Sequence, residues 1–287
     1  MESDRHSVSV SGDYPPLHHM LRDLLISVEF EDKARCVAKA PVVPQICTER
    51  GGVHAGVVAT LVDLLGASLA IRAIYPDWIA TAGLSIYMTR PATSGTIVAS
   101  GTVIRAGHSI NVIDVDISEE SSSTTSTSIG SAIMTYSRLP RRNDTIEVEA
   151  DSVNGITFAF EGSGLSRHYL DEVGLQILDE AAGIVEIKMT DYIRNSFGAI
   201  QGGIVALLAD IAGQCAARAA TGQPLITKDL TLHYLSQGKV GPFLTRARML
   251  RKTGDTALTR VELVDRGAND RLLMLGLNTA TLDYNPF

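Results

Sequence analysis

Asp63 is the only acidic residue in a long apolar segment, and this segment begins at a glycine-rich turn. Residues 51–56 read Gly-Gly-Val-His-Ala-Gly, and the apolar run of residues 57–70 follows directly. A buried carboxylate without a partner is strongly disfavoured, so Asp63 must reach water, a ligand or a polar group. In such a place it can act as a general base or as a nucleophile. A helix that begins at the turn would add backbone N–H groups able to stabilise a negatively charged oxygen.

The apolar run has helical spacing, and its small residues share one side. At about 100° per residue, that side carries Gly56, Ala59, Thr60, Asp63, Ala67 and Ala70. The larger Val and Leu side chains fall mostly on the opposite side. Such a helix can bury one face in a core while a ligand or a second backbone approaches the acid on the other. The alternative is an Asp that caps a helix or joins a structural ion pair.

The chain contains this unit twice. Residues 198–210 align with residues 51–63 without a gap, which places Asp210 at the position of Asp63 and Gln201 at that of His54. The small face recurs as Gly203, Ala206, Gly213 and Ala217. The two acids are 147 positions apart in a chain of 287 residues, so the repeat is about half of the chain. We therefore expect two copies of one structural unit.

Composition limits the classes of partner. The net charge is −7 and the pI is about 5.5, which argues against nucleic acid and anionic membranes as general partners. Cys36, Cys47 and Cys215 are odd in number and lack metal-ligand spacing. They fit a reducing compartment, so we expect a cytoplasmic protein without a disulfide framework, metal or cofactor. Read as membrane spans, the two apolar helices would each place a carboxylate within the bilayer, which disfavours that alternative.

Around the two units the sequence predicts mostly strands. We expect a disordered lead-in over residues 1–16, a short helix over 18–26, extended chain over 28–43, and strands over 79–90, 95–106, 109–117 and 129–139. Residues 118–128 are rich in Ser and Thr and are expected to form a solvated hairpin tip. Residues 140–147 are the predicted linker between domains spanning 17–139 and 148–287.

The second half repeats this order. Strands are predicted over residues 153–160, 175–189, 225–235, 241–251, 257–264 and 272–282, with the second long helix ending at Ala220. A helix that is apolar around most of its circumference needs walls on several sides. A curved antiparallel sheet wrapped around each helix would supply them, so the predicted class is α+β.

Each half resembles the hotdog fold, and the loop and helix resemble those of the phenylacetate-pathway type of acyl-CoA thioesterase, within the 4-hydroxybenzoyl-CoA thioesterase-like superfamily. That family has Asn, Gly three residues later, His-Gly-Gly after three more, and Asp nine residues beyond the His. The second half keeps Asn195, Gly198, Gly202, Gly203 and Asp210 but has Gln201 for the His. The first half keeps Gly51, His54, Gly56 and Asp63 but has Thr48 for the Asn and Ala55 for a Gly. The resemblance implies two fused hotdog domains.

The resemblance also implies two composite sites that hydrolyse an acyl-CoA thioester, because the family takes the loop and the Asp of one site from opposite units. Site one would contain Thr48, His54 and Ala55 with Asp210. Site two would contain Asn195, Gln201 and Gly202 with Asp63, and it keeps more of the motif. The catalytic candidates are Asp63, Asn195, Gly202, Asp210, His54 and Ala55. The substrate-binding candidates are Thr48, Gln201, Gly203, Gly56, Thr81, Arg90, Arg105 and Arg251.

Several alternatives stay open at this level. His54 can orient the turn by hydrogen bonding rather than transfer protons, since Gln201 replaces it in the second copy. Arg105 and Arg251 can bind CoA phosphates or be ordinary charges of surface turns. The protein could bind acyl-CoA without hydrolysing it, or, less readily, be a hotdog hydratase or dehydratase. The family's habit of pairing implies a homodimer with four hotdog units.

Overall fold

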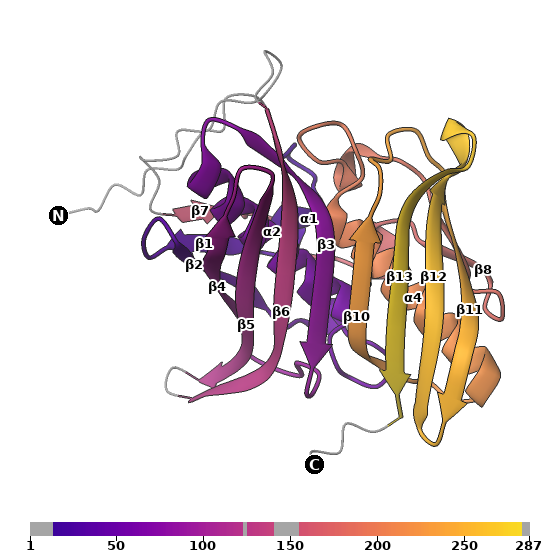
Figure 1. Cartoon of the computed structure of the whole chain (residues 1–287). Coiled ribbons are helices and arrows are strands. Elements are labelled where there is room, and N and C mark those ends of the chain that lie inside the picture. The colour runs from indigo at the N-terminus through magenta and orange to yellow at the C-terminus, as the bar shows by residue number, and fades with distance from the viewer. Residues whose placement is uncertain (1–13, 123–124, 141–154, 283–287) are drawn as a thin grey trace.

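The protein is built on one large antiparallel sheet with two long helices on one of its faces (Figure 1). The computed structural model describes residues 14–122, 125–140 and 155–282. In these ranges thirteen strands form a single sheet in the order β7-β1-β2-β4-β5-β6-β3-β10-β13-β12-β11-β9-β8. First-half strands therefore lie together, with β7 from the second half added at their outer edge.

The first half contains one long helix and six strands among its described residues. Its elements are α1 (Met20–Asp23), β1 (Ser27–Phe30), β2 (Arg35–Pro41), η1 (Pro44–Ile46), α2 (Ala55–Ile74), β3 (Trp78–Met88), β4 (Thr96–Ala106), β5 (Ile110–Ser122) and β6 (Thr125–Leu139). The apolar run of residues 57–70 thus lies within α2. The strands after α2 alternate buried and exposed positions, because one face of the sheet covers the helix and the other is open.

The second half has the same order. Its elements are β7 (Gly155–Thr157), α3 (Tyr169–Glu172), β8 (Gln176–Asp179), β9 (Ile184–Ile187), η2 (Asp191–Ile193), α4 (Gly202–Thr221), β10 (Ile226–Tyr234), β11 (Phe243–Thr253), β12 (Thr256–Asp265), η3 (Arg266–Ala268) and β13 (Arg271–Thr281). The repeat predicted from the two Asp residues is therefore also a repeat of helices and strands.

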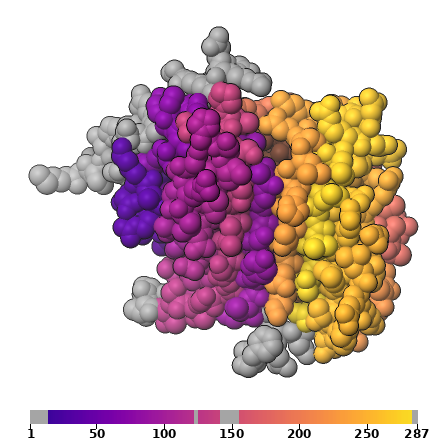
Figure 2. Space-filling model, viewed as in Figure 1, coloured from indigo at the N-terminus to yellow at the C-terminus, as the bar shows by residue number. Residues whose placement is uncertain are grey.

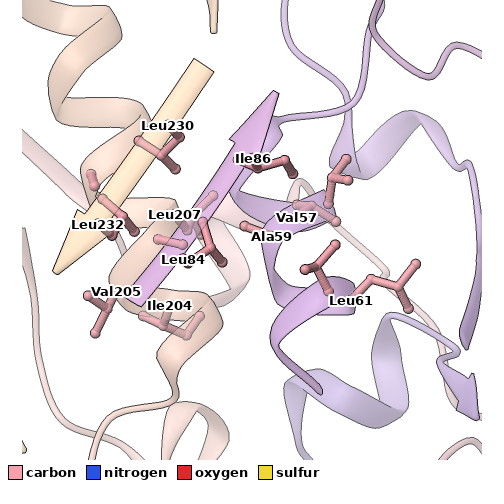
Figure 3. Close-up of a cluster of buried hydrophobic side chains, with 14 of the residues drawn as sticks. Val57, Ala59, Leu61, Leu84, Ile86, Ile204, Val205, Leu207, Leu230 and Leu232 are labelled. Atoms are coloured by element: carbon pink, nitrogen blue, oxygen red, sulfur yellow. The ribbon is translucent and has the colours of Figure 1, made fainter. Parts of the chain in front are cut away.

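The halves join where β3 pairs with β10 in antiparallel register, with Leu84 opposite Leu232 and Ile86 opposite Leu230. Figure 2 shows the strands of the two halves in direct contact across this seam. The same four side chains point toward α2 and α4, where they pack with Val57, Leu61, Ile204 and Leu207 (Figure 3). The sheets of the two halves therefore pair edge to edge, with both long helices on the same side.

The two helices touch through their glycine-containing first turns. A side chain at Gly56 would overlap the backbone of Leu207, and one at Gly203 would overlap Thr60. Small residues at these positions therefore allow the first turn of each helix to lie against the middle of the other. Both helices are long and apolar enough to cross a membrane, but 67% of the apolar window of α2 and 78% of that of α4 are buried inside the protein.

Three local predictions were wrong. The helix expected over residues 18–26 is only the turn Met20–Asp23, because the chain passes through a positive φ of 53° at Leu25 and enters β1. The strand expected over 175–189 is two short strands, β8 and β9. The expected solvated tip over 118–128 is mostly strand, since β5 and β6 extend into it, and Glu119 within it is buried.

The predicted domain boundaries remain predictions. Most of the expected lead-in and nearly all of the expected linker fall on residues 1–13 and 141–154, outside the described residues.

Candidate active site

Site two forms where the middle of α2 meets the start of α4. Gln201 is the N-cap residue of α4, Gly202 is its first residue, and Asp63 reaches them from α2. A Cβ atom built on Gly202 would overlap the Asp63 carboxylate. Glycine at position 202 is thus what lets the acid approach the helix start. The predicted pairing of Asp63 with the loop of the opposite half is present in the fold.

Asp63 is buried and weakly partnered. The Thr81 hydroxyl donates to Asp63 Oδ1 at 2.9 Å, and Tyr136 donates to the backbone oxygen of Asp63 at 2.9 Å. The first bond orients the carboxylate and the second holds α2 against β6. Burial raises the pKa of Asp63 from 3.8 to about 6, against the opposing effect of the Thr81 hydrogen bond. A carboxylate with this pKa is a stronger base than an exposed Asp and remains mostly ionised at neutral pH.

The N–H groups of Gly202 and Gly203 point out of the first turn of α4. They belong to the first turn, so they have no acceptor within the helix, and no acceptor for them exists in the described part of the chain. Tyr234 donates to the Gly202 carbonyl oxygen at 3.0 Å and so fixes the peptide that follows Gly202. Site two therefore offers an ionisable acid and unoccupied N–H donors side by side.

The loop before α4 is shaped by Asn195. Its Oδ1 accepts hydrogen bonds from the N–H groups of Phe197 at 2.9 Å and Ala199 at 3.0 Å. The sequence motif made Asn195 a catalytic candidate; the structure adds this loop-shaping role for its oxygen. Phe197 then packs edge-on against Trp78 of the first half, with ring centres 5.0 Å apart. The loop of site two is thereby fastened to the half that carries Asp63.

Site one has the same frame but a different hydrogen-bond pattern. The Gly56 N–H donates to Asp210 Oδ2 at 2.9 Å, so the acid occupies the helix start itself. Thr227 and Gln214 both donate to Asp210 Oδ1, the latter at 2.7 Å. Asn278 donates to the Thr227 hydroxyl at 2.8 Å and extends the network. Asp210 is fully buried and accepts three hydrogen bonds.

Two substitutions between the repeats account for this difference. Ala55 stands where the second copy has Gly202, and its methyl group occupies the space that the Asp63 carboxylate uses in site two. Gln214 stands where the first copy has Ala67, and its amide adds a donor to Asp210. The acid of site one is therefore directed to the Gly56 N–H and held there.

Thr48 and His54 line the loop of site one. The Thr48 hydroxyl accepts from the N–H of Arg50 at 3.2 Å, which is a bond within the turn. His54 is buried, its Nδ1 has no hydrogen-bond partner among the residues that the structure describes, and its ring stands edge-on to His168 with centres 5.9 Å apart. Burial lowers the pKa of His54, with Asp210 opposing and His168 adding to that effect. His54 is therefore held neutral, and among the described residues its side chain makes no hydrogen bond that would orient the turn.

The predicted arginines are divided among three places. Arg90 pairs with the buried Glu119, which also accepts from the N–H groups of Thr93 at 3.0 Å and Ser94 at 2.8 Å. Arg105 lies near the end of β4, exposed, at the same end of the sheet as Thr81 and three strands from it. Arg251 lies near the end of β11, exposed, in the corresponding place relative to Thr227.

Sequence reasoning missed a pair of histidines that connect the halves. His19 and His168 each accept a backbone N–H at Nδ1 and place Nε2 3.0 Å from a carbonyl of the other half, at Arg194 and Cys47 respectively. The neighbouring His18 is exposed, whereas His19 is buried between the halves. The signal available was the repeat itself, because Cys47 and Arg194 are equivalent positions.

Fold and site together define a tandem hotdog protein with composite sites between its halves. The model of the thioesterase superfamily matches residues 50–126 and 197–270, more than half of the chain. The chain belongs to this superfamily. A Halobacterium salinarum protein named as an esterase is 30% identical to this chain over 107 residues, which cover 35% of this chain and 70% of that protein.

Solved structures agree on the fold. The tesB protein of Mycobacterium avium subspecies paratuberculosis has a TM-score of 0.60 at 12% identity, covering 88% of this chain and 95% of that one. An acyl-ACP thioesterase from Bacteroides thetaiotaomicron has a TM-score of 0.54 at 8% identity, covering 86% and 97%. A hot dog fold protein of Alicyclobacillus acidocaldarius has a TM-score of 0.55 at 12% identity, covering 91% and 96%.

Proposed function

We propose that the protein is an acyl-CoA thioesterase whose working site is site two, with Asp63 as the general base. The observation that carries this proposal is the contrast between the two acids. Asp63 lies beside free N–H groups and accepts one side-chain hydrogen bond, whereas Asp210 is bonded to the N–H of its own helix start. Because Asp210 accepts from the Gly56 N–H, site one keeps neither a free acid nor the full pair of N–H donors that site two offers.

The reaction follows from the groups in site two. The thioester carbonyl oxygen accepts hydrogen bonds from the Gly202 and Gly203 N–H groups, which become stronger as negative charge develops there. Asp63 takes a proton from water, and the water oxygen attacks the carbonyl carbon. When the tetrahedral intermediate collapses, the carbon–sulfur bond breaks, and the proton held by Asp63 passes to the departing sulfur. The products are a carboxylic acid and CoA.

Direct attack by Asp63 on the carbonyl is the competing route, and it forms a mixed anhydride. Single-turnover hydrolysis in ¹⁸O-labelled water distinguishes the two. The base mechanism places the label in the released acid during the first turnover, whereas hydrolysis of an anhydride at the Asp63 carbonyl leaves it in the protein.

Arg105 is proposed to bind the CoA phosphates. It is exposed at the end of the sheet where site two lies, on the open face rather than the helix face, and three strands along the sheet correspond to roughly 14 Å at the usual strand spacing. Its exposed position leaves the guanidinium accessible to a ligand at that sheet end. Arg90 is not assigned this role because its guanidinium is paired with Glu119.

The homodimer and the cytoplasmic location also belong to this proposal. Ile133 and Leu277 flank the seam on the open face of the sheet, in one row with Ser85 and Thr231, and they are 48% and 43% exposed. A second copy could cover such a face. Cys36, Cys47 and Cys215 are free, as expected in a reducing compartment.

Incubation with a panel of acyl-CoA thioesters tests the function, with free thiol and bound ligand measured together. Release of thiol from at least one thioester is the expected result. Tight binding without release would instead support the alternative that the protein binds acyl-CoA without hydrolysing it. The hydrogen-bonded Asp210 of site one is the observation that favours this alternative.

A further inference from the structure

The first described residues of the chain lie against site two. Arg22 holds this strap, residues 14–16, by donating to the carbonyl oxygen of Pro16 at 2.8 Å and to that of Pro15 at 2.6 Å. Its third hydrogen bond goes to the carbonyl oxygen of Phe158 at 2.7 Å. One guanidinium thus fastens the strap to the body of the protein, and the strap carries Tyr14.

Within the described ranges, the one side-chain hydrogen bond of Tyr14 is with Gln201, the residue directly before Gly202. The Tyr14 ring stands edge-on to His19, with centres 5.2 Å apart, and His19 in turn reaches the carbonyl of Arg194 in the site-two loop. Burial raises the pKa of Tyr14 well above its usual value, so the phenol keeps its proton. Tyr14 is therefore a neutral phenol whose side chain is held by two contacts, one with Gln201 and one with His19.

Gln201 does not use its side chain to cap α4. Its amide instead turns to Tyr14, with Nε2 as donor and the phenol oxygen as acceptor. In this arrangement the phenol O–H and the second amide N–H have no acceptor in the described part of the chain. If the amide is instead rotated so that its oxygen accepts from the phenol O–H, both amide N–H groups lack an acceptor in that part of the chain. Either way, the pair keeps at least two hydrogen-bond donors beside the Gly202 N–H.

Site one lacks this arrangement. His54 holds the position of Gln201, and its ring faces His168 instead of a hydroxyl. The strap therefore distinguishes the two sites. It contacts site two, where the acid lies beside the N–H donors of the helix start.

We propose that Tyr14 is a positioning residue of site two, which aims the Gln201 amide at the oxygen of a thioester bound at the start of α4. This inference rests on the proposed function of site two. Gln201 touches the substrate and Tyr14 acts through it. The hydrogen bond fixes the amide before substrate binds, so its donor needs no reorganisation as charge develops on the oxygen.

A double-mutant cycle tests the proposal with Tyr14→Phe, Gln201→Ala and their combination. Tyr14→Phe keeps the ring on His19 and removes the hydroxyl alone. We expect kcat to fall roughly 3- to 10-fold, the value of a neutral hydrogen bond, with KM and Tm nearly unchanged. The double variant should be no slower than Gln201→Ala, because Tyr14 has no route to substrate except through Gln201. Tyr75→Phe, at an exposed tyrosine, is the matched control and should leave kcat unchanged.

Three results would overturn the proposal: an unchanged kcat for Tyr14→Phe, a lowered Tm with an unchanged kcat, or effects that multiply in the double variant. Asp63→Asn is measured in the same series. If that variant keeps full activity, the assignment of site two is what fails, so the two failures are distinguishable.

Discussion

The N–H of Gly56 donates to the carboxylate of Asp210 at 2.9 Å, and this single bond separates the two sites of a nearly symmetric molecule. Its counterpart in the repeat would join Gly203 to Asp63, and that bond is absent among the described residues. A carboxylate that accepts from the Gly56 N–H occupies one of the two donors that a thioester oxygen would use. The start of α2 is therefore bonded within the protein, whereas the start of α4 is open to substrate.

Asp63→Asn should abolish most hydrolysis, by at least ~10²-fold in kcat, while Asp210→Asn should leave much of it. Asparagine keeps the size and hydrogen bonding of Asp63 but accepts no proton. Initial rates of thiol release measure both variants, and thermal unfolding checks that each is folded. If Asp210→Asn alone silences the enzyme, site one is the working site and our reliance on Asn195 and Gly202 is wrong.

Ala55→Gly combined with Gln214→Ala should remove one of the three hydrogen bonds to Asp210, give its carboxylate room at the helix start and so open site one. The first change provides the space that Gly202 provides in site two, and the second removes a donor to Asp210. Introduced together into Asp63→Asn, they should restore measurable thiol release. Gln214→Ala alone is the control, since it leaves the Ala55 methyl in place. If the variant with all three substitutions releases thiol no faster than Asp63→Asn, then Ala55 and Gln214 do not explain why site one is closed.

Activity should fall as the pH drops below about 6, where the buried Asp63 takes up a proton. The pH profile of kcat/KM reports this pKa in the free enzyme. Stability should change in the opposite sense. Because the pKa in the folded protein exceeds the ordinary 3.8, ionisation of Asp63 destabilises the fold by roughly 3 kcal/mol at neutral pH, and this destabilisation is relieved as the pH falls from 6 to 4.

Asp63→Asn removes this ionisation, so its Tm should match or exceed that of the wild type at pH 7. The advantage should shrink toward pH 4. Thermal unfolding of both proteins across this range is the measurement, and an advantage that grew at low pH would contradict the assignment.

Arg105→Ala should raise KM for acyl-CoA several-fold without affecting a thioester of a short thiol that lacks the phosphates. Arg90→Ala should do the reverse: it should lower Tm and leave KM unchanged, because it leaves the buried Glu119 without its cationic partner. Each variant serves as the control for the other. A KM effect at Arg90 and none at Arg105 would place the CoA phosphates elsewhere.

Sedimentation at micromolar concentration should show a homodimer. Ile133→Lys together with Leu277→Lys, placed on the open face of the sheet, should convert it to a monomer with the fold retained. A wild-type protein that sediments only as a monomer would contradict the four-unit assembly.

The repeat of the sequence alone determined the architecture. Two aligned glycine-rich turns, each nine residues ahead of an Asp in an apolar helix, specified two equivalent units and where each acid lies on its helix. The alternating strands after each helix followed from their period of two, which is a local property. The comparison of Thr48 with Asn195 and of Ala55 with Gly202 also indicated two unequal sites.

The tertiary structure decided how the sites differ, because the deciding contacts join residues far apart in the chain. Glu119 was assigned to solvent by its polar neighbours, yet the loop after β3 folds over it and provides Arg90 and two backbone donors. Tyr14 and Gln201 meet across 187 positions, and Gly56 and Asp210 across 154. Local pattern shows which face of an element is apolar. It carries no information on which distant donor will satisfy a buried acid, and here that partner distinguishes an acid free to act as a base from one held in the fold.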